Sequence, residues 1–111
     1  MLRVLAVWEP MLVTDWGRPL TPVLGRMPDA RVRQFWDQAH LVARQIAADA
    51  REPQPAPECC DDSGILWDTI AVYPKGATWS DRLPPAVFLN GPVVEIESAL
   101  RSKVAELVSG Q

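Results

Sequence analysis

The sequence predicts one α/β domain over residues 1–111, built on a mixed four-stranded sheet with flanking helices. Three observations predict this class. Short runs rich in Val, Ile and aromatic residues alternate with stretches whose apolar residues recur at helical spacing. The eleven prolines fall between these runs, where they interrupt neither a helix nor a central strand. An Asn-Gly pair at residues 90–91 is typical of a tight turn between strands.

The first half of the chain predicts two strands and two helices. Residues 2–8 form a nearly continuous apolar run, which predicts a buried strand. Residues 19–27 have apolar side chains at helical spacing and predict a short helix. Residues 30–36 alternate in polarity, as a half-buried strand does. From Asp37, a candidate N-cap, helical periodicity continues to about residue 51.

The second half predicts two more strands and a final helix. Residues 64–73 are rich in β-branched and aromatic side chains and predict a strand. Residues 85–89 predict another strand, and after the turn at 90–91 we expect residues 93–96 to continue the sheet. Residues 97–108 place Leu and Val on one stripe and predict a helix.

The predicted order is β-α-β-α-β-β-α. Strands joined through a helix pair in parallel by a right-handed crossover, and a hairpin pairs its strands antiparallel. This order, with Val-Trp-Glu-Pro at residues 7–10, resembles the thioredoxin-like superfamily, and small bacterial members in particular. The resemblance covers nearly the whole chain and implies a thioredoxin-like fold. Catalytic members have Cys-x-x-Cys at the start of the first helix; residues 14–19 here read T-D-W-G-R-P, so that chemistry does not carry over.

Charge and hydropathy exclude two classes of protein. Fourteen acidic and eleven basic residues give a net charge of −3, and no Lys/Arg run favours nucleic acid. The apolar runs are far shorter than the ~18 residues that a membrane span needs. The first residues are too short an apolar stretch for a secretory signal, so we expect a cytoplasmic protein.

The two cysteines, Cys59 and Cys60, are adjacent within a Pro-rich loop at residues 52–63. Adjacent cysteines can close an eight-membered disulfide ring, which needs a strained peptide geometry, or can together bind a soft ion such as Cu(I) or Hg(II). The pair predicts thiol-dependent redox or soft-metal handling, with no other cofactor. Incidental or structural cysteines remain the alternative, and whether the protein is an enzyme stays open.

The predicted topology gives the cysteine loop a position. If the strand at 64–73 runs antiparallel to the strand at 2–8, it starts at the sheet edge where the first strand ends. The loop 52–63 would then neighbour residues 9–19. Thioredoxin-like proteins carry out their chemistry at this edge, which faces the N-terminus of the first helix and favours a thiolate.

Charges near the cysteines act in opposite directions. Arg18 and the first-helix N-terminus would stabilise a thiolate and lower the thiol pKa below the ~8.5 of free cysteine. Negative neighbours disfavour the thiolate and raise the thiol pKa. The acidic residues that flank the pair are Glu58, Asp61 and Asp62.

Three further residues, Asp15, Trp16 and Trp79, are candidates for binding. Asp15 is a carboxylate ahead of the first helix, where an N-cap or Asx turn is the commoner role. His40, the only histidine, is more simply a surface or capping residue than a general base. Trp16 and Trp79 fall in predicted loops and suit a groove or partner surface. They support the alternative function, a non-catalytic thioredoxin-like binding or dimerisation module. The expected partners are a second copy, another protein or a small thiol.

Overall fold

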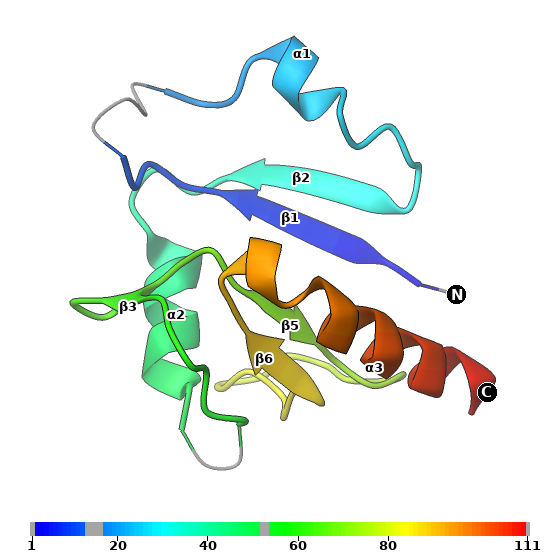
Figure 1. The fold of residues 1–111 in the computed structure, drawn as a ribbon. Coiled ribbons are helices and arrows are strands. Elements are labelled where there is room, and N and C mark those ends of the chain that lie inside the picture. Colours follow the sequence, from blue (N-terminus) through cyan, green and yellow to red (C-terminus); the bar gives the residue numbers. More distant parts are fainter. Residues whose placement is uncertain (1, 13–16, 52–53, 111) are drawn as a thin grey trace. The chain divides into compact units, whose positions relative to one another are not determined.

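The computed structural model describes residues 2–12, 17–51 and 54–110 (Figure 1). The chain divides into two units, Met1–Val42 and Ala43–Gln111, and each is described by itself. A single domain over residues 1–111 therefore stays a prediction.

The first unit contains a pair of parallel strands. β1 (Val4–Trp8) and β2 (Val32–Trp36) pair in register from Val4 opposite Val32 to Trp8 opposite Trp36. The connection between them carries α1 (Thr21–Leu24), a single turn with a proline at its start and Gly25 at its end. Proline fits the first turn of a helix because that position needs no N–H donor. The predicted strand, helix and parallel strand of this half are confirmed, but the predicted burial of the first strand is wrong, because Val4, Leu5 and Val7 of β1 are exposed.

The second unit contains two small antiparallel hairpins. β3 (Asp61–Asp62) pairs with β4 (Ile65–Leu66), and β5 (Ile70–Val72) pairs with β6 (Phe88–Asn90). The hairpin of β3 and β4 was not predicted. Its buried residue is Leu66, which joins the core of this unit.

Two longer helices complete the described chain. α2 (Leu41–Asp49) starts at the end of the first unit and continues in the second. α3 (Glu97–Ser109) follows a 3-10 turn, Val93–Glu95, and confirms the helix predicted at residues 97–108. Within the described ranges, no helix has the length and apolar content to cross a membrane.

The predicted four-stranded sheet is wrong, and with it the thioredoxin-like fold class. The strands that the structure describes form three separate sheets of two strands each, β1 with β2, β3 with β4, and β5 with β6. No described strand connects the parallel pair to either hairpin. The chain is a small α/β protein in which sequence-adjacent strands pair only with each other.

The predicted strand at residues 64–73 breaks in the middle, which is one reason for this difference. Asp68, between β4 and β5, has a φ of 51°, a left-handed conformation that no strand contains. The backbone of Gly91 also lies close to Asp68. A Cβ at Gly91 would collide with the carbonyl oxygen of Asp68. The two halves of the predicted strand thus pair with different partners.

The predicted continuation of the sheet over residues 93–96 is also wrong. Pro92 precedes this segment and has no N–H to donate to a strand ladder. The N–H of Val93 instead donates to the Asp68 carboxylate at 3.2 Å, and the chain turns into the 3-10 segment. The segment after β6 therefore adds no strand to the sheet of β5 and β6.

The hydrophobic core of the second unit is small. Leu66, Ala86 and Leu89 are buried together, from β4, the loop before β6, and β6 itself. Half-buried apolar side chains pack around them; they are Ile46, Ala47, Ala50, Cys60, Ala71 and Tyr73. One of the two cysteines is thus part of the packing around the core.

Asp37 caps the start of α2, as its position predicted. Its two carboxylate oxygens accept hydrogen bonds from the N–H groups of Leu41 and Val42, both at 2.8 Å. The helix itself starts at Leu41, four residues later than the predicted boundary. The carboxylate thus satisfies two N–H donors that have no partner within the helix.

We expect Asp37→Ala to lower the free energy of unfolding by about 1–2 kcal/mol, the usual effect of removing a side-chain cap. Asp37→Asn keeps one oxygen acceptor and should lose less. Urea denaturation of the two variants and the unmodified chain measures the difference. Equal losses for both variants would show that the carboxylate acts in some way other than as a cap.

Candidate functional site

Cys59 and Cys60 are joined by a disulfide between adjacent residues. Their Cα atoms lie 3.7 Å apart, the separation of neighbouring residues across a trans peptide. Cys60 has a φ of 80°, which is uncommon outside glycine. Since the chain has two cysteines, both are in this disulfide. The predicted adjacent pair therefore forms a compact oxidised group.

Backbone hydrogen bonds hold the chain on both sides of the disulfide. The N–H of Glu58 donates to the side-chain oxygen of Asn90 at 2.9 Å, which ties the loop to the end of β6. The N–H of Trp67 donates to the Cys60 carbonyl at 3.0 Å, which ties it to the residue after β4. The disulfide is thus anchored to both hairpins of the second unit.

The turn between β3 and β4 fixes the chain immediately after the cysteines. Ser63 and Gly64 both have positive φ values, 52° and 84°. Two such residues in succession form the two-residue hairpin turn whose twist matches that of the flanking strands. The Asp61 carboxylate accepts a hydrogen bond from the Gly64 N–H at 2.9 Å. This local turn was available in the sequence as a Ser-Gly pair, a known turn signal.

An open hollow of about 430 Å³ lies beside the disulfide. Its volume is within the range of small-molecule sites in proteins, roughly 300–1,000 Å³. The end of α2, the cysteine loop and β4 line it. Its lining residues are Ala47, Ala50, Ala56, Pro57, Glu58, Cys59, Cys60, Asp61 and Leu66. The lining contains two carboxylates and no basic side chain.

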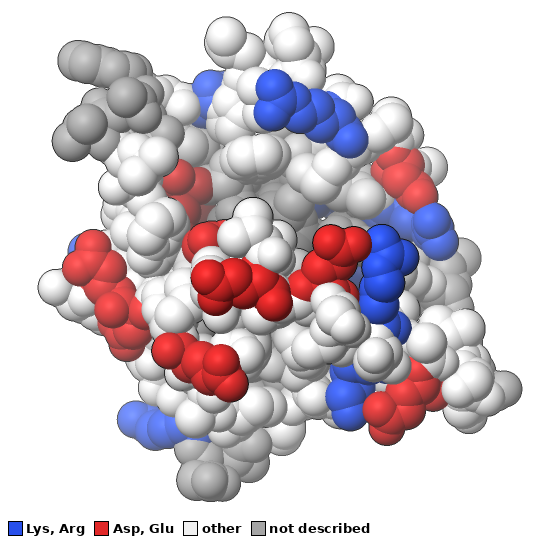
Figure 2. Space-filling view, viewed as in Figure 1, with Lys and Arg blue, Asp and Glu red and all other residues white. Residues whose placement is uncertain are grey.

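The charge around the disulfide is negative. Figure 2 shows acidic side chains over β3 and the loop that precedes it. Glu58, Asp61 and Asp62 are all exposed. The ion pairs found among the described residues involve other carboxylates. The three charges that the sequence placed beside the cysteines therefore remain uncompensated by an ion pair.

The predicted source of positive charge has less support. Arg18 is exposed and belongs to the first unit, whereas the cysteines belong to the second. α1 is a single turn of four residues, too short to have a substantial dipole. The predicted proximity of the cysteine loop to residues 9–19 required β1 and the strand at residues 64–73 to share one sheet, and they do not. Stabilisation of a thiolate by Arg18 stays a prediction.

The other predicted binding residues are distributed through the chain. Asp15 and Trp16 lie outside the described residues. Trp79 lies in the loop after β5 and is 50% exposed. A role for it at a partner surface stays a prediction.

A polar pair that sequence reasoning missed lies where the parallel strands end. Nδ1 of His40 is 3.1 Å from Oε2 of Glu9, and the two side chains are 18% and 12% exposed. Glu9 directly follows β1, and His40 follows β2 by a few residues. The carboxyl ends of parallel strands meet at one edge, and this rule was the signal that could have found the pair. The bond to Glu9 fixes the orientation of the imidazole ring.

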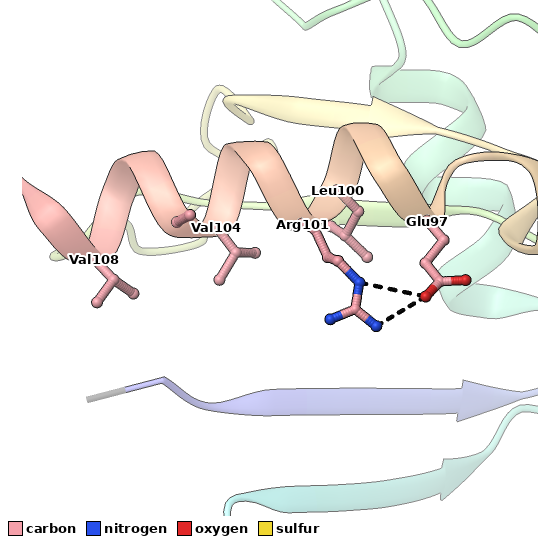
Figure 3. Close-up of a pocket in the computed structure, with 6 residues that line it drawn as sticks. Glu97, Leu100, Arg101, Val104 and Val108 are labelled. Atoms are coloured by element: carbon pink, nitrogen blue, oxygen red, sulfur yellow. Dashed lines mark hydrogen bonds and ion pairs between the residues drawn. The ribbon is translucent and has the colours of Figure 1, made fainter.

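A second hollow, of about 510 Å³, lies along one face of α3. Figure 3 shows Leu100, Val104 and Val108 on the same side of this helix, with Arg101 paired to Glu97 at 2.8 Å. The predicted apolar stripe of the last helix is therefore present. The residues that line this second hollow include no nucleophile and no cluster of acids or bases that suggests a reaction.

In the part of the chain that the structure describes, no three or more His, Cys, Asp and Glu side chains come together as a metal site. No family model, no curated protein and no solved structure matches the chain. The resemblance to the thioredoxin-like superfamily thus stays an expectation. A function has to be argued from the chemistry of the cysteine site itself.

Proposed function

We propose that this chain is a thiol–disulfide exchange protein whose reacting group is the Cys59–Cys60 pair. One observation carries the proposal: the chain's two cysteines form a disulfide that borders an open hollow. A structural disulfide gains most by closing a long loop, because the loss of entropy in the unfolded chain grows with loop length. A bond between neighbours closes almost no loop. The Cys59–Cys60 disulfide is therefore better explained by thiol–disulfide exchange than by a gain in stability.

The exchange proceeds in two balanced steps. A thiolate from a small thiol attacks one sulfur, forms a mixed disulfide and releases the other cysteine as a thiolate. A second thiol then attacks the sulfur of the small thiol and releases the first cysteine. Two molecules of thiol are oxidised to one disulfide, and their two electrons and two protons end on Cys59 and Cys60. The reverse reaction oxidises the protein with a small disulfide.

The environments of the two sulfurs differ. Cys60 packs against the core cluster of Leu66, Ala86 and Leu89, whereas Cys59 is not among the side chains packed there. Access decides which sulfur a thiolate attacks. We therefore expect attack on Cys59, with Cys60 as the leaving group that recloses the ring.

The test is exchange of the oxidised protein with 2-mercaptoethanol, quenched with an alkylating agent and analysed by peptide mass. We expect two alkylated cysteines at completion and a mixed disulfide on Cys59 at early times. Treated with oxidised 2-mercaptoethanol instead, Cys59→Ser and Cys60→Ser should each stop at a mixed disulfide and release one 2-mercaptoethanol, because neither variant can close the ring. A protein in which both cysteines stay unreactive, or react as independent thiols, would contradict the proposal.

Soft-metal handling is the second form of the same proposal. A reduced pair offers two sulfur ligands, which suit Cu(I) or Hg(II). The disulfide favours exchange over metal binding, because an oxidised pair has no thiolate to donate. If one equivalent of Cu(I) protects the reduced cysteines from an alkylating agent, soft-metal binding is favoured.

A binding or dimerisation module is the alternative from another class. The observation that favours it is exposure of several large apolar side chains, which indicate a partner where they gather in one patch. The most exposed are Leu5, Leu20, Leu41 and Val94. Sedimentation at micromolar concentration tests the homodimer, and a single species of 12.3 kDa would count against it.

A further inference from the structure

We infer that the Cys59–Cys60 disulfide selects its thiol by charge, reacting faster with cationic than with anionic small thiols. This inference rests on the proposed exchange function and names its substrate class. The reacting sulfurs and two carboxylates, of Glu58 and Asp61, line the same hollow. A thiol that enters the hollow therefore brings its own charge close to two negative groups.

Neither lining carboxylate is in an ion pair among the described residues. One oxygen of Asp61 accepts a hydrogen bond from Gly64, which neutralises nothing, since a backbone amide has no net charge. Asp62 lies next along β3 and adds a third negative charge beside the site. No basic side chain is among the residues that line the hollow.

The helical wall of the hollow adds to this selectivity. Ala47 and Ala50 line the hollow, and they lie at and just beyond the last turn of α2. The C-terminal end of a helix has a partial negative charge, although in α2 the carbonyls of Ala47 and Asp49 accept hydrogen bonds from the N–H groups of Ala50 and Arg51. The two alanines and Leu66 give a short aliphatic stem something to contact. The hollow therefore suits a small thiol with an aliphatic stem and a positive or neutral end.

Coulomb's law gives the size of the expected effect. Two unit charges about 7 Å apart in water change a rate or equilibrium constant by a factor of about three. Changing the thiol from anionic to cationic replaces repulsion by attraction, so the difference in electrostatic energy at each carboxylate is twice that of a single charge pair. For two lining carboxylates, after partial screening by dissolved ions, a preference of about tenfold is expected at low salt.

The experiment compares reduction of the oxidised protein by cysteamine, which is cationic, and by 3-mercaptopropionate, which is anionic. Each rate is divided by the rate of the same thiol with oxidised 2-mercaptoethanol, an uncharged disulfide, so that intrinsic reactivity cancels. We expect cysteamine to be favoured about tenfold at low ionic strength. In ~1 M salt, where charges are screened within about 3 Å, the ratio should fall towards one.

Two variants separate the local charges from the net charge of the protein. Glu58→Gln removes one lining carboxylate and should reduce the preference about threefold or more. Glu106→Gln makes the same change of net charge on α3, away from the hollow, and should leave the preference unchanged. Both positions are exposed, so the folded structure should tolerate either change.

The outcomes distinguish the inference from the function on which it rests. If both thiols reduce the disulfide with a normalised ratio near one, the charge inference is overturned and exchange stands. If the ratio is tenfold but Glu58→Gln and Glu106→Gln lower it equally, selection comes from net charge and the inference is also overturned. If neither thiol reduces the protein, both the inference and the proposed function fail.

Discussion

Gln54→Ala is expected to lower the free energy of unfolding by about 2–4 kcal/mol, the largest effect that we predict for a single side chain. The Gln54 amide nitrogen donates to the carbonyls of Leu83, at 3.2 Å, and Pro84, at 2.8 Å. Its oxygen accepts the N–H of Ala86 at 2.8 Å. Gln54 is only 7% exposed, so its loss leaves buried polar groups unpaired.

The effect reaches the cysteine site because Gln54 belongs to the cysteine loop and its bond to Ala86 holds a residue of the core cluster. Gln38→Ala is the matched control, because Gln38 is exposed in the turn before α2. It should change stability by less than about 0.5 kcal/mol. Urea denaturation measures both variants. Equal stability of Gln54→Ala and the unmodified chain would mean that water replaces these bonds without cost.

Acid is expected to destabilise the protein partly through Asp49, the last residue of α2. Its side chain is 5% exposed, and the carboxylate accepts hydrogen bonds from the Gln45 side chain and the Leu83 N–H, both at 3.0 Å. These bonds, with the nearby charges of Arg82 and Arg51, lower the pKa of Asp49 below its ordinary value of 3.8. The folded protein therefore favours the charged form more than the unfolded chain does.

The sign of the pH effect follows from that direction. A carboxyl with a lowered pKa stabilises the folded state fully above its unfolded pKa, and the stabilisation is lost as pH falls through the folded pKa. Stability should thus begin to fall below about pH 5. Asp49→Asn should be less stable than the unmodified chain at pH 7, and the difference should shrink as pH falls.

Asp29 contributes to the same acid dependence. Its hydrogen bonds to the Arg31 side chain and backbone lower its pKa to about 2. Because it acts in the same direction, Asp49→Asn should remove part of the pH dependence and not all of it. Urea denaturation at several pH values from 7 to 3 measures these differences. A constant difference between Asp49→Asn and the unmodified chain at every pH would exclude Asp49 as a source.

Local signals predicted the helices and the two parallel strands, but not the strand boundaries of the second unit. The apolar stripe of α3 and the alternating pattern of β2 depend on neighbours within a few residues, so the sequence contains them directly. The separate sheets depend on features that the pattern does not contain. The left-handed Asp68 divides the strand predicted at residues 64–73; aspartate adopts this conformation more often than most residues, but the pattern of side chains does not show where it does so.

The candidate site also combines features that are local in sequence with features that depend on tertiary structure. The cysteine pair and its acidic neighbours are adjacent in sequence and could be identified there. The partners of Gln54 lie about thirty residues away, and His40 and Glu9 are separated by 31 residues. Such pairs form only when tertiary structure brings distant segments together. A buried polar side chain therefore gives no sign of its partner in the sequence alone.

The proposed function and the inferred preference for cationic thiols both require that Cys59 and Cys60 form a reversible disulfide with each other. Its most direct test is the mass of the peptide that contains both cysteines, from protein alkylated natively in air and after reduction. We predict no alkyl group and a mass lower by two hydrogens before reduction, two alkyl groups after it, and return to the first state on reoxidation. Two free thiols in the aerated native protein, or a disulfide only between two chains, would contradict the account.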